Sequence, residues 1–375
     1  MKKIFTLLLF LLLSQFTLGQ NSDSLKIELS PYSSFRGHFE VYNEEVEIQE
    51  NASRIGFEIS VYKKDLRFFA GVELGINLFR SNQRFNTDAN TSSGFLAIDN
   101  TQQTQVFGNR LGFIGVDFGK FGMVSIGKQW SVYYDITGYT DKFNVFGGQG
   151  SATYVANSDG GETGTGRASQ SLIYRNNFGN FYTAAQFQFR STSNNHFLDG
   201  FGLSAQYELL KGLRLGAAYN RSYFPDLIID NTLGMDDHPE YYSFGLSFIN
   251  ETWNIGLVYA NQTNGDLTDL LVAEELVAGV YDANGFEAFV KFIKPKYSII
   301  AGYNHYDPDV NDLPINGDFN TRDLIFGAEF KPTKRAYLYG EYRVASGDTR
   351  VGISEIDVLT LGIRIDLSNS YSKYF

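Results

Sequence analysis

Two short motifs contain residue types that bind phosphate or metal, but each lacks a residue that this chemistry needs. The stretch GETGTGRA, Gly161 to Ala168, has the spacing of a phosphate-binding loop. It offers Arg167 and Ala168 where Lys and Ser/Thr must contact phosphate and Mg²⁺. The stretch DPDVNDLPINGD, 307–318, has calcium-loop acids but no glycine at position six and ends in Asp318 instead of a bidentate Glu. We predict no cofactor and no metal site, with incidental divalent-ion binding by this acidic loop as the alternative.

The histidines give little support for catalysis. The sequence has four, His38, His196, His238 and His305, and only His238, beside Asp236 and Asp237, suggests an acid–histidine pair. A hydrolase of the serine type needs a histidine placed against a serine and a carboxylate, and no G-x-S-x-G elbow occurs. A solvated acidic loop explains His238 better. We therefore expect a protein that is not an enzyme.

The amino terminus has the pattern of a secretory signal peptide. Lys2 and Lys3 precede an apolar run, and a small residue follows at Gly19, so we expect residues 1–19 to be removed. Loss of the two lysines changes the formal net charge from −11 to −13, which argues against nucleic acid as a partner. With no cysteine in 375 residues, disulfides and thiolate metal sites are excluded. No uninterrupted apolar run of 18 residues follows the signal, which argues against a spanning helix.

Alternation with a period of two residues dominates the rest of the chain and predicts β-strands. In LRFFAGVELGINLF, Phe68, Val72 and Leu74 fall on an apolar face, and Glu73 and Asn77 fall on the other. The same alternation occurs in ASRIGFEISV, where Arg54 lies on the polar face. With 24 Tyr, 33 Phe, 38 Gly and only 7 Pro, the composition also favours strands.

Sixteen such segments can be counted, and their connections are sorted by length. They begin near residues 25, 52, 66, 109, 121, 167, 180, 199, 212, 239, 252, 284, 296, 321, 334 and 356. Seven short turns alternate with eight polar, mostly long loops, at about 43–51, 80–108, 131–166, 191–198, 222–238, 262–283, 306–319 and 346–355. Short turns at one rim and long loops at the other are typical of transmembrane barrels. We predict an all-β, 16-stranded antiparallel transmembrane β-barrel over residues 20–375; the alternative is a secreted all-β protein with one solvated face per sheet.

One region of the chain resembles a known family. The residues that carry the similarity are RIGFEI at Arg54, the run from Asn109 to Asp141, FGG at Phe146 to Gly148, and GRASQSLIYRN from Gly166. In them the chain resembles the general bacterial porins, the trimeric diffusion channels of Gram-negative outer membranes. The sequence similarity covers about residues 50–180. Beyond them the chain resembles the family only in its architecture. It implies that the third loop, 131–166, folds into the barrel and narrows the pore.

The resemblance also implies which residues form the pore constriction. Its basic wall would include Arg54, Lys128 and Arg167, its acidic loop side Asp141, and its loop tip Phe146, Gly147 and Gly148. Parity places Lys128 on the apolar face, so an irregularity at Gly127 would be needed to turn it inward. Val145 and Gln149 stand where the family has acids, which weakens the acidic side of the loop.

The resulting functional prediction is a porin in the outer membrane of a Gram-negative bacterium. It would form a water-filled channel for passive diffusion of small hydrophilic solutes and ions, surrounded by outer-membrane lipid and assembled as a homotrimer. One alternative is a substrate-specific channel for an anion such as phosphate or for a sugar. Weaker alternatives are a non-conducting structural or receptor barrel and a barrel hydrolase. The sequence leaves open whether loop 262–283 contains a helix.

Overall fold

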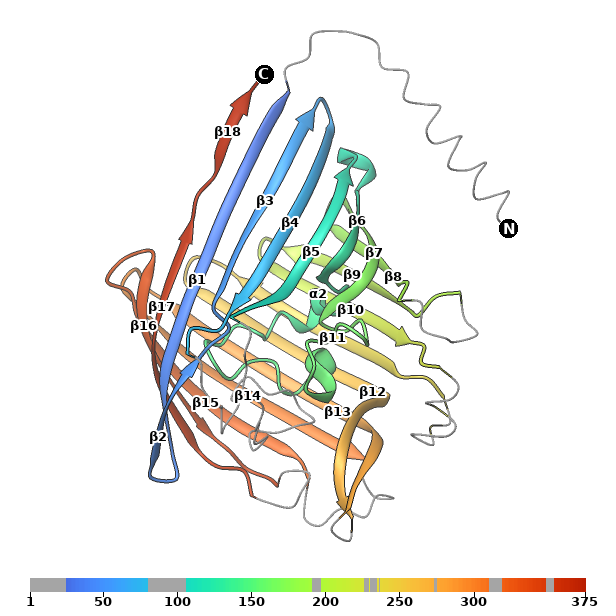
Figure 1. Ribbon diagram of the computed structural model, residues 1–375. Coiled ribbons are helices and arrows are strands. Elements are labelled where there is room, and N and C mark those ends of the chain that lie inside the picture. Colours follow the sequence, from blue (N-terminus) through green and yellow to red (C-terminus); the bar gives the residue numbers. More distant parts are fainter. Residues whose placement is uncertain are drawn as a thin grey trace.

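The computed structural model describes residues 25–79, 106–190, 197–225, 229, 235, 237–272, 275–309, 319–348 and 354–375. Strands form wherever the alternation predicts them, and they form one antiparallel sheet that closes on itself (Figure 1). The elements are β1 (Lys26–Tyr42), β2 (Glu45–Glu50), β3 (Arg54–Lys63), β4 (Leu66–Ile76), β5 (Phe107–Asp117), η1 (Gly119–Phe121), β6 (Met123–Trp130), α2 (Tyr134–Thr137), η2 (Ala152–Asn157), β7 (Arg167–Phe178), β8 (Phe181–Gln188), β9 (Gly200–Leu210), β10 (Leu213–Ser222), β11 (Glu240–Ile249), β12 (Trp253–Val272), β13 (Glu275–Ile293), β14 (Tyr297–Asp309), β15 (Thr321–Phe330), β16 (Ala336–Val344), β17 (Val358–Ser368) and β18 (Tyr371–Tyr374).

The first strand closes the barrel. One edge of β1 pairs with β3 and β2, and its other edge pairs with β17 and β18. Because β2 continues the line of β3 and β18 that of β17, the described residues form a barrel of sixteen strands, as predicted. Among the described residues, closure pairs both edges along most of the barrel wall, and β2 and the outer parts of β12 and β13, at the loop end, pair on one edge only. A lipid environment requires paired edges because hydrocarbon cannot hydrogen-bond a free backbone group.

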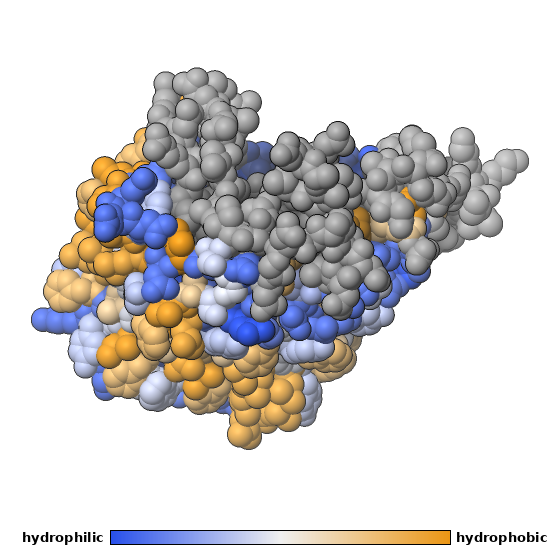
Figure 2. All heavy atoms as spheres, turned by 90° about the horizontal axis from the view of Figure 1, so that it is seen from below, coloured by the Kyte–Doolittle hydropathy of each residue, from blue (hydrophilic) through white to orange (hydrophobic). Residues whose placement is uncertain are grey.

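The two faces of the strands have the predicted polarity. Phe68 is 47% exposed on the outside of β4, whereas Phe69 is 8% exposed on the inside. Large exposed apolar side chains recur on the outer face all around the barrel, among them Phe57, Ile114 and Phe326. Viewed from the loop end, hydrophobic residues form much of the outer wall (Figure 2). An apolar surface of this extent would be unfavourable in water but suits contact with lipid.

The connections are also sorted as predicted, with two corrections. Both described termini and the seven short turns lie at one end, and the longer connections lie at the other (Figure 1). Residues 43–51, expected as a loop, are mostly strand, because β1 and β2 form a hairpin paired up to Tyr42 and Glu45. The region 262–283 is likewise a hairpin extension of β12 and β13, so its described residues, 262–272 and 275–283, form strands and no helix.

The helical elements of the described residues are short. Within the part of the chain that the structure describes, no helix is long and apolar enough to span a bilayer. The four-residue α2 and the six-residue η2 both lie in segment 131–166, between β6 and β7. In Figure 1 this segment runs inside the barrel instead of projecting from its rim.

Candidate functional site

Segment 131–166, called the inner loop below, lies directly against the inner wall of the barrel. Two glycines of the wall make this approach possible. A Cβ on Gly285 of β13 would lie 1.4 Å from the carbonyl oxygen of Gly150, and one on Gly256 of β12 would lie 2.2 Å from that of Tyr139. Glycine inside a strand often marks a close approach of another backbone, and here it creates the contact surface for the loop.

Two buried carboxylates of the wall anchor the inner loop. Glu341 of β16 accepts hydrogen bonds from the backbone N–H groups of Asn144 at 2.6 Å, Val145 at 2.9 Å and Phe146 at 3.4 Å. Glu287 of β13 accepts one from the Ser151 N–H at 2.7 Å and one from the Thr140 hydroxyl. Each carboxyl group offers two oxygens that can accept several backbone and hydroxyl donors at once. The carboxylates therefore replace the strand pairing that a loop inside a barrel lacks.

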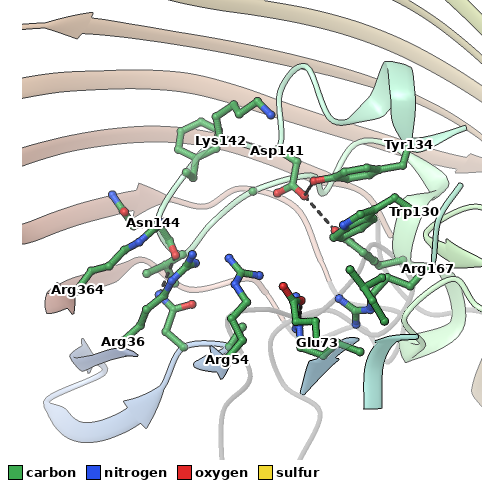
Figure 3. Close-up of a pocket in the computed structure, with 18 of the residues that line it drawn as sticks. Arg36, Arg54, Glu73, Trp130, Tyr134, Asp141, Lys142, Asn144, Arg167 and Arg364 are labelled. Carbon is green, nitrogen blue, oxygen red and sulfur yellow. Dashed lines mark hydrogen bonds and ion pairs between the residues drawn. The ribbon is translucent and has the colours of Figure 1, made fainter. Parts of the chain in front are cut away.

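Between the inner loop and the opposite wall is a pocket of about 700 Å³, called the constriction pocket below. Its strand side carries an arginine row, defined as Arg36, Arg54, Arg110 and Arg364. These side chains come from β17, β1 and β3, which are neighbours at the point where the barrel closes, and from β5, which β4 separates from β3. Figure 3 shows Arg36, Arg54 and Arg364 on one side of the pocket, with Asp141 and Lys142 across it.

The loop side of the constriction pocket has one acid held by two tyrosines. Asp141 Oδ2 accepts hydrogen bonds from the Tyr134 hydroxyl at 2.9 Å and the Tyr154 hydroxyl at 3.0 Å. Burial, together with the charge of Asp141, raises the pKa of both tyrosines well above the usual value, so both remain donors. Trp130 stacks on Tyr134 with ring centroids 4.0 Å apart, which fixes the tyrosine in place.

Comparison with known proteins identifies the family. The family model described as Gram-negative porin matches residues 39–350, most of the chain. The chain belongs to the Gram-negative porins. It is an outer-membrane protein that forms a diffusion channel.

Two curated relatives and one solved structure illustrate the similarity. The chain is 26% identical to outer membrane protein F of Serratia marcescens, over 70% of this chain and 75% of the relative. It is 29% identical to the putative outer membrane porin protein NmpC of Escherichia coli, over 68% and 72%. A solved structure of Salmonella typhi OmpF in complex with daunomycin superposes with a TM-score of 0.72 at 20% identity, covering 91% and 97% of the two chains. At that identity, the structural likeness shows the fold.

The structure places the predicted constriction residues of this porin in two groups. Arg54, Asp141, Gly147 and Arg167 line the constriction pocket. Lys128, Phe146 and Gly148 are not among the described residues that line this pocket.

The side chain of Lys128 turns toward the inner loop. Its Nζ lies 2.5 Å from Asp159 Oδ2, and Arg167 Nε lies 3.4 Å from the same oxygen. The turn occurs at the irregularity that parity required: Gly127 has φ of +130° and the pairing of β6 with β7 shifts register there. Burial raises the pKa of Asp159, but the hydrogen bond from Lys128 and the charge of Arg167 outweigh it and lower that pKa below its usual value.

Phe146 and the two glycines form the point where the loop tip meets the wall. Phe146 is fully buried in a cluster with Val145, Ile325, Tyr339 and Val358. Gly148 has φ of +64°, a conformation that glycine adopts without strain, and Gly147 lies against Asp141. In the loop tip, Phe146 therefore packs against the barrel wall and Gly147 faces the pocket.

Sequence reasoning missed three members of the arginine row. Arg36 and Arg364 had a usable signal, because both alternate with outward apolar residues in SSFRGHFEV and LGIRIDL. Arg110 had none of that kind. It lies at a bulge where Glu73 pairs with Leu111 but Leu74 pairs with Asn109, so simple parity does not apply.

Proposed function

We propose that this porin is a passive channel whose size limit and ion preference are set at the constriction pocket. The observation that supports this most directly is the inner loop itself. Anchored by Glu341 and Glu287, it faces the arginine row across open space. Small hydrophilic solutes and ions would cross down their gradients. The positive row on one side and Asp141 on the other would orient dipolar solutes during passage.

We also propose a homotrimer, as the resemblance to the family implies. The second loop, 80–108, lies almost wholly outside the described residues. The signal peptide, residues 1–19, lies outside them too, and the mature domain 20–375 remains a proposal. Three closing steps per insertion event in a bilayer would support the trimer, and mass spectrometry of the purified protein would locate the cleavage site.

We propose a channel without catalytic activity. Within the described residues no group of three or more His, Asp or Glu side chains could hold a metal ion. His238 Nδ1 accepts a hydrogen bond from the Phe224 N–H at 3.3 Å, an arrangement that stabilises a loop. His196 and most of the acidic stretch 307–318 lie outside the described residues.

Planar-bilayer recording of the purified protein tests the proposal. We expect discrete conductance steps that rise linearly with salt concentration, and liposome swelling rates that fall steeply as neutral sugars increase in size. A channel that binds one preferred sugar would instead show a current that this sugar blocks at low concentration. A protein without conductance would contradict the proposal and leave a structural or receptor barrel.

A further inference from the structure

The arginine row has an arrangement that is costly for the fold alone. Arg36 of β1 lies directly opposite Arg364 of β17 in the antiparallel register. Arg54 pairs with Ser34, two residues from Arg36 on the same face, which makes Arg36 and Arg54 diagonal neighbours. Like charges directly opposite each other destabilise a strand pair. A row of cations across adjacent strands therefore indicates a ligand-related role better than a structural one.

Acidic partners neutralise the two ends of the row. Arg364 Nε lies 2.9 Å from Asp366 Oδ2, and Arg110 Nε lies 2.8 Å from Glu73 Oε1. The nearby Glu50 is occupied by the backbone N–H groups of Ala52 and Ser53. Each end of the row is thus a neutral ion pair, and the positive charge is concentrated at its centre.

The two central arginines, Arg36 and Arg54, are not neutralised by an ion pair of their own. Arg36 is 8% exposed and its Nε donates to the Ser34 hydroxyl at 2.7 Å. Among the described residues, no carboxylate lies within ion-pair distance of Arg36 or Arg54. Both guanidinium groups line the constriction pocket, where Figure 3 shows them facing the open space. Guanidinium groups in this position have the donor geometry that binds an oxyanion.

The inner-loop side of the pocket carries too little negative charge to neutralise Arg36 and Arg54. Lys142 stands next to Asp141 on the inner loop, and Val145 and Gln149 at the tip are uncharged and buried. The described residues that line the pocket comprise six cationic side chains, Arg36, Arg54, Arg110, Lys142, Arg167 and Arg364, and two acidic ones, Glu73 and Asp141. Cations remain in excess when Asp366 and Asp159, the partners of Arg364 and Arg167, are added. The narrow part of the channel is therefore positive, although the whole chain carries a formal charge of −11.

We propose that the constriction pocket prefers anions and that Arg36 and Arg54 together hold the oxyanion group of a passing solute, a phosphate or a carboxylate. This rests on the proposed diffusion function and adds a sign and a binding site to it. Rings of basic side chains are a known basis for anion selectivity in pores. The pair acts during transit: it binds weakly enough to release the solute to either side.

The sign is tested by the reversal potential of the full-length protein in a planar bilayer under a KCl gradient. We expect a chloride-to-potassium permeability ratio above one, and a drop of at least about twofold in the Arg36→Gln/Arg54→Gln variant, a change that corresponds to a loss of only about 0.4 kcal/mol because a factor of ten corresponds to 1.4 kcal/mol. The matched control is Arg67→Gln. Arg67 lies opposite Tyr62, eight residues along β3 from Arg54, roughly 26 Å at the usual strand rise, and is already paired with Glu58.

The outcomes separate the two proposals. A conducting protein that favours potassium, or a double variant with an unchanged ratio, would overturn the anion inference while leaving the diffusion channel intact. A protein that does not conduct would contradict the diffusion channel itself. An equal change in the Arg67→Gln control would show that any lumen charge shifts the ratio, and would also overturn the assignment to Arg36 and Arg54.

Binding is tested separately from charge by adding inorganic phosphate, and in a parallel arm succinate, to the chloride solution. We expect both to reduce the chloride current of the parent protein at millimolar concentration. The Arg36→Lys/Arg54→Lys variant keeps the charge but loses the paired donors of the guanidinium groups. It should retain the permeability ratio and lose most of the block. Block that persists in this variant would refute oxyanion binding by the pair; block by phosphate alone would narrow the solute class to phosphates.

Discussion

The two walls of the constriction pocket are built in different ways. The arginine row stands on hydrogen-bonded strands, so the barrel fixes the position of each charge. Asp141 and Lys142 stand on a loop whose position depends on a few side-chain acceptors, chiefly Glu341 and Glu287. The strand wall should therefore tolerate local substitutions without moving, whereas the loop wall should shift as a unit when an anchor is removed.

The largest expected effect follows removal of the tip anchor. Glu341→Ala deprives the N–H groups of Asn144, Val145 and Phe146 of their acceptor. Each buried donor left without a partner costs about 1–3 kcal/mol. We expect the loop to leave the wall, the single-channel conductance to change clearly, and the open-channel noise to rise. The control is Glu58→Gln, at a lumen acid paired with Arg67, in which conductance and open-channel noise should both stay at parent values. A quiet, unchanged Glu341→Ala channel would show that the loop wall is as rigid as the strand wall.

A clash at the loop contact should give the next largest effect. In Gly285→Ala the new methyl group would overlap the carbonyl oxygen of Gly150, so the loop must move. We expect an altered conductance and faster cleavage of the loop by added protease, measured on folded protein in detergent. Gly108→Ala is the matched control, because its Cβ meets no atom within 4 Å. Equal behaviour of the two variants would contradict the close approach described here.

Removal of the charge of Asp141 should shift the reversal potential less than removal of the central arginines does, and in the opposite direction. Asp141→Asn keeps the shape of the side chain and can still accept hydrogen bonds from Tyr134 and Tyr154, but it removes the negative charge. We expect the reversal potential to shift further toward anions with little change in conductance. A shift toward cations would mean that the variant had moved the loop, and would place Asp141 among the anchors.

The smallest effect is expected at the base of the loop. Lys128 and Asp159 are partly exposed, at 22% and 26%, and such ion pairs contribute roughly 0–1 kcal/mol. Lys128→Met should therefore leave conductance near the parent value at neutral pH.

The pH dependence of this contact has a definite sign. Because the folded-state pKa of Asp159 is lowered, ionised Asp159 stabilises the folded loop above its ordinary pKa. That contribution is lost only as the pH falls through the lowered value. We expect no change in the parent channel attributable to this pair between pH 5 and 8, and recordings of Lys128→Met and parent at several pH values would reveal any departure.

Sequence reasoning predicted the strand wall better than the loop wall for a physical reason. Alternation reports which side of a strand faces lipid, so the sixteen strands and the inward position of Arg54 followed from local pattern. It fails at bulges, which is why Arg110 escaped notice and why Lys128 needed a break at Gly127.

The loop wall has no such period. That residues 131–166 fold inward came from the resemblance, and no local signal distinguished Phe146, which packs on the wall, from Gly147, which faces the pocket. The anchoring acids, Glu287 and Glu341, lie far along the chain from the loop and become recognisable only when the barrel brings them to it. Pairing of β1 with β2 was missed because β2 has only six residues, in which Val46 and Ile48 alone carry the alternation.

The register between β1 and β17 sets a condition on biogenesis. Tyr32 pairs with Ser368 and Val41 with Leu359, so an early strand waits for a partner that is translated more than 300 residues later. Until it arrives, the leading strand has a bare edge that invites pairing with other chains. The polypeptide must therefore be kept unfolded, bound to chaperones, until it reaches the bilayer and β1 can pair with β17. Shortening β17 should yield aggregates instead of a smaller pore.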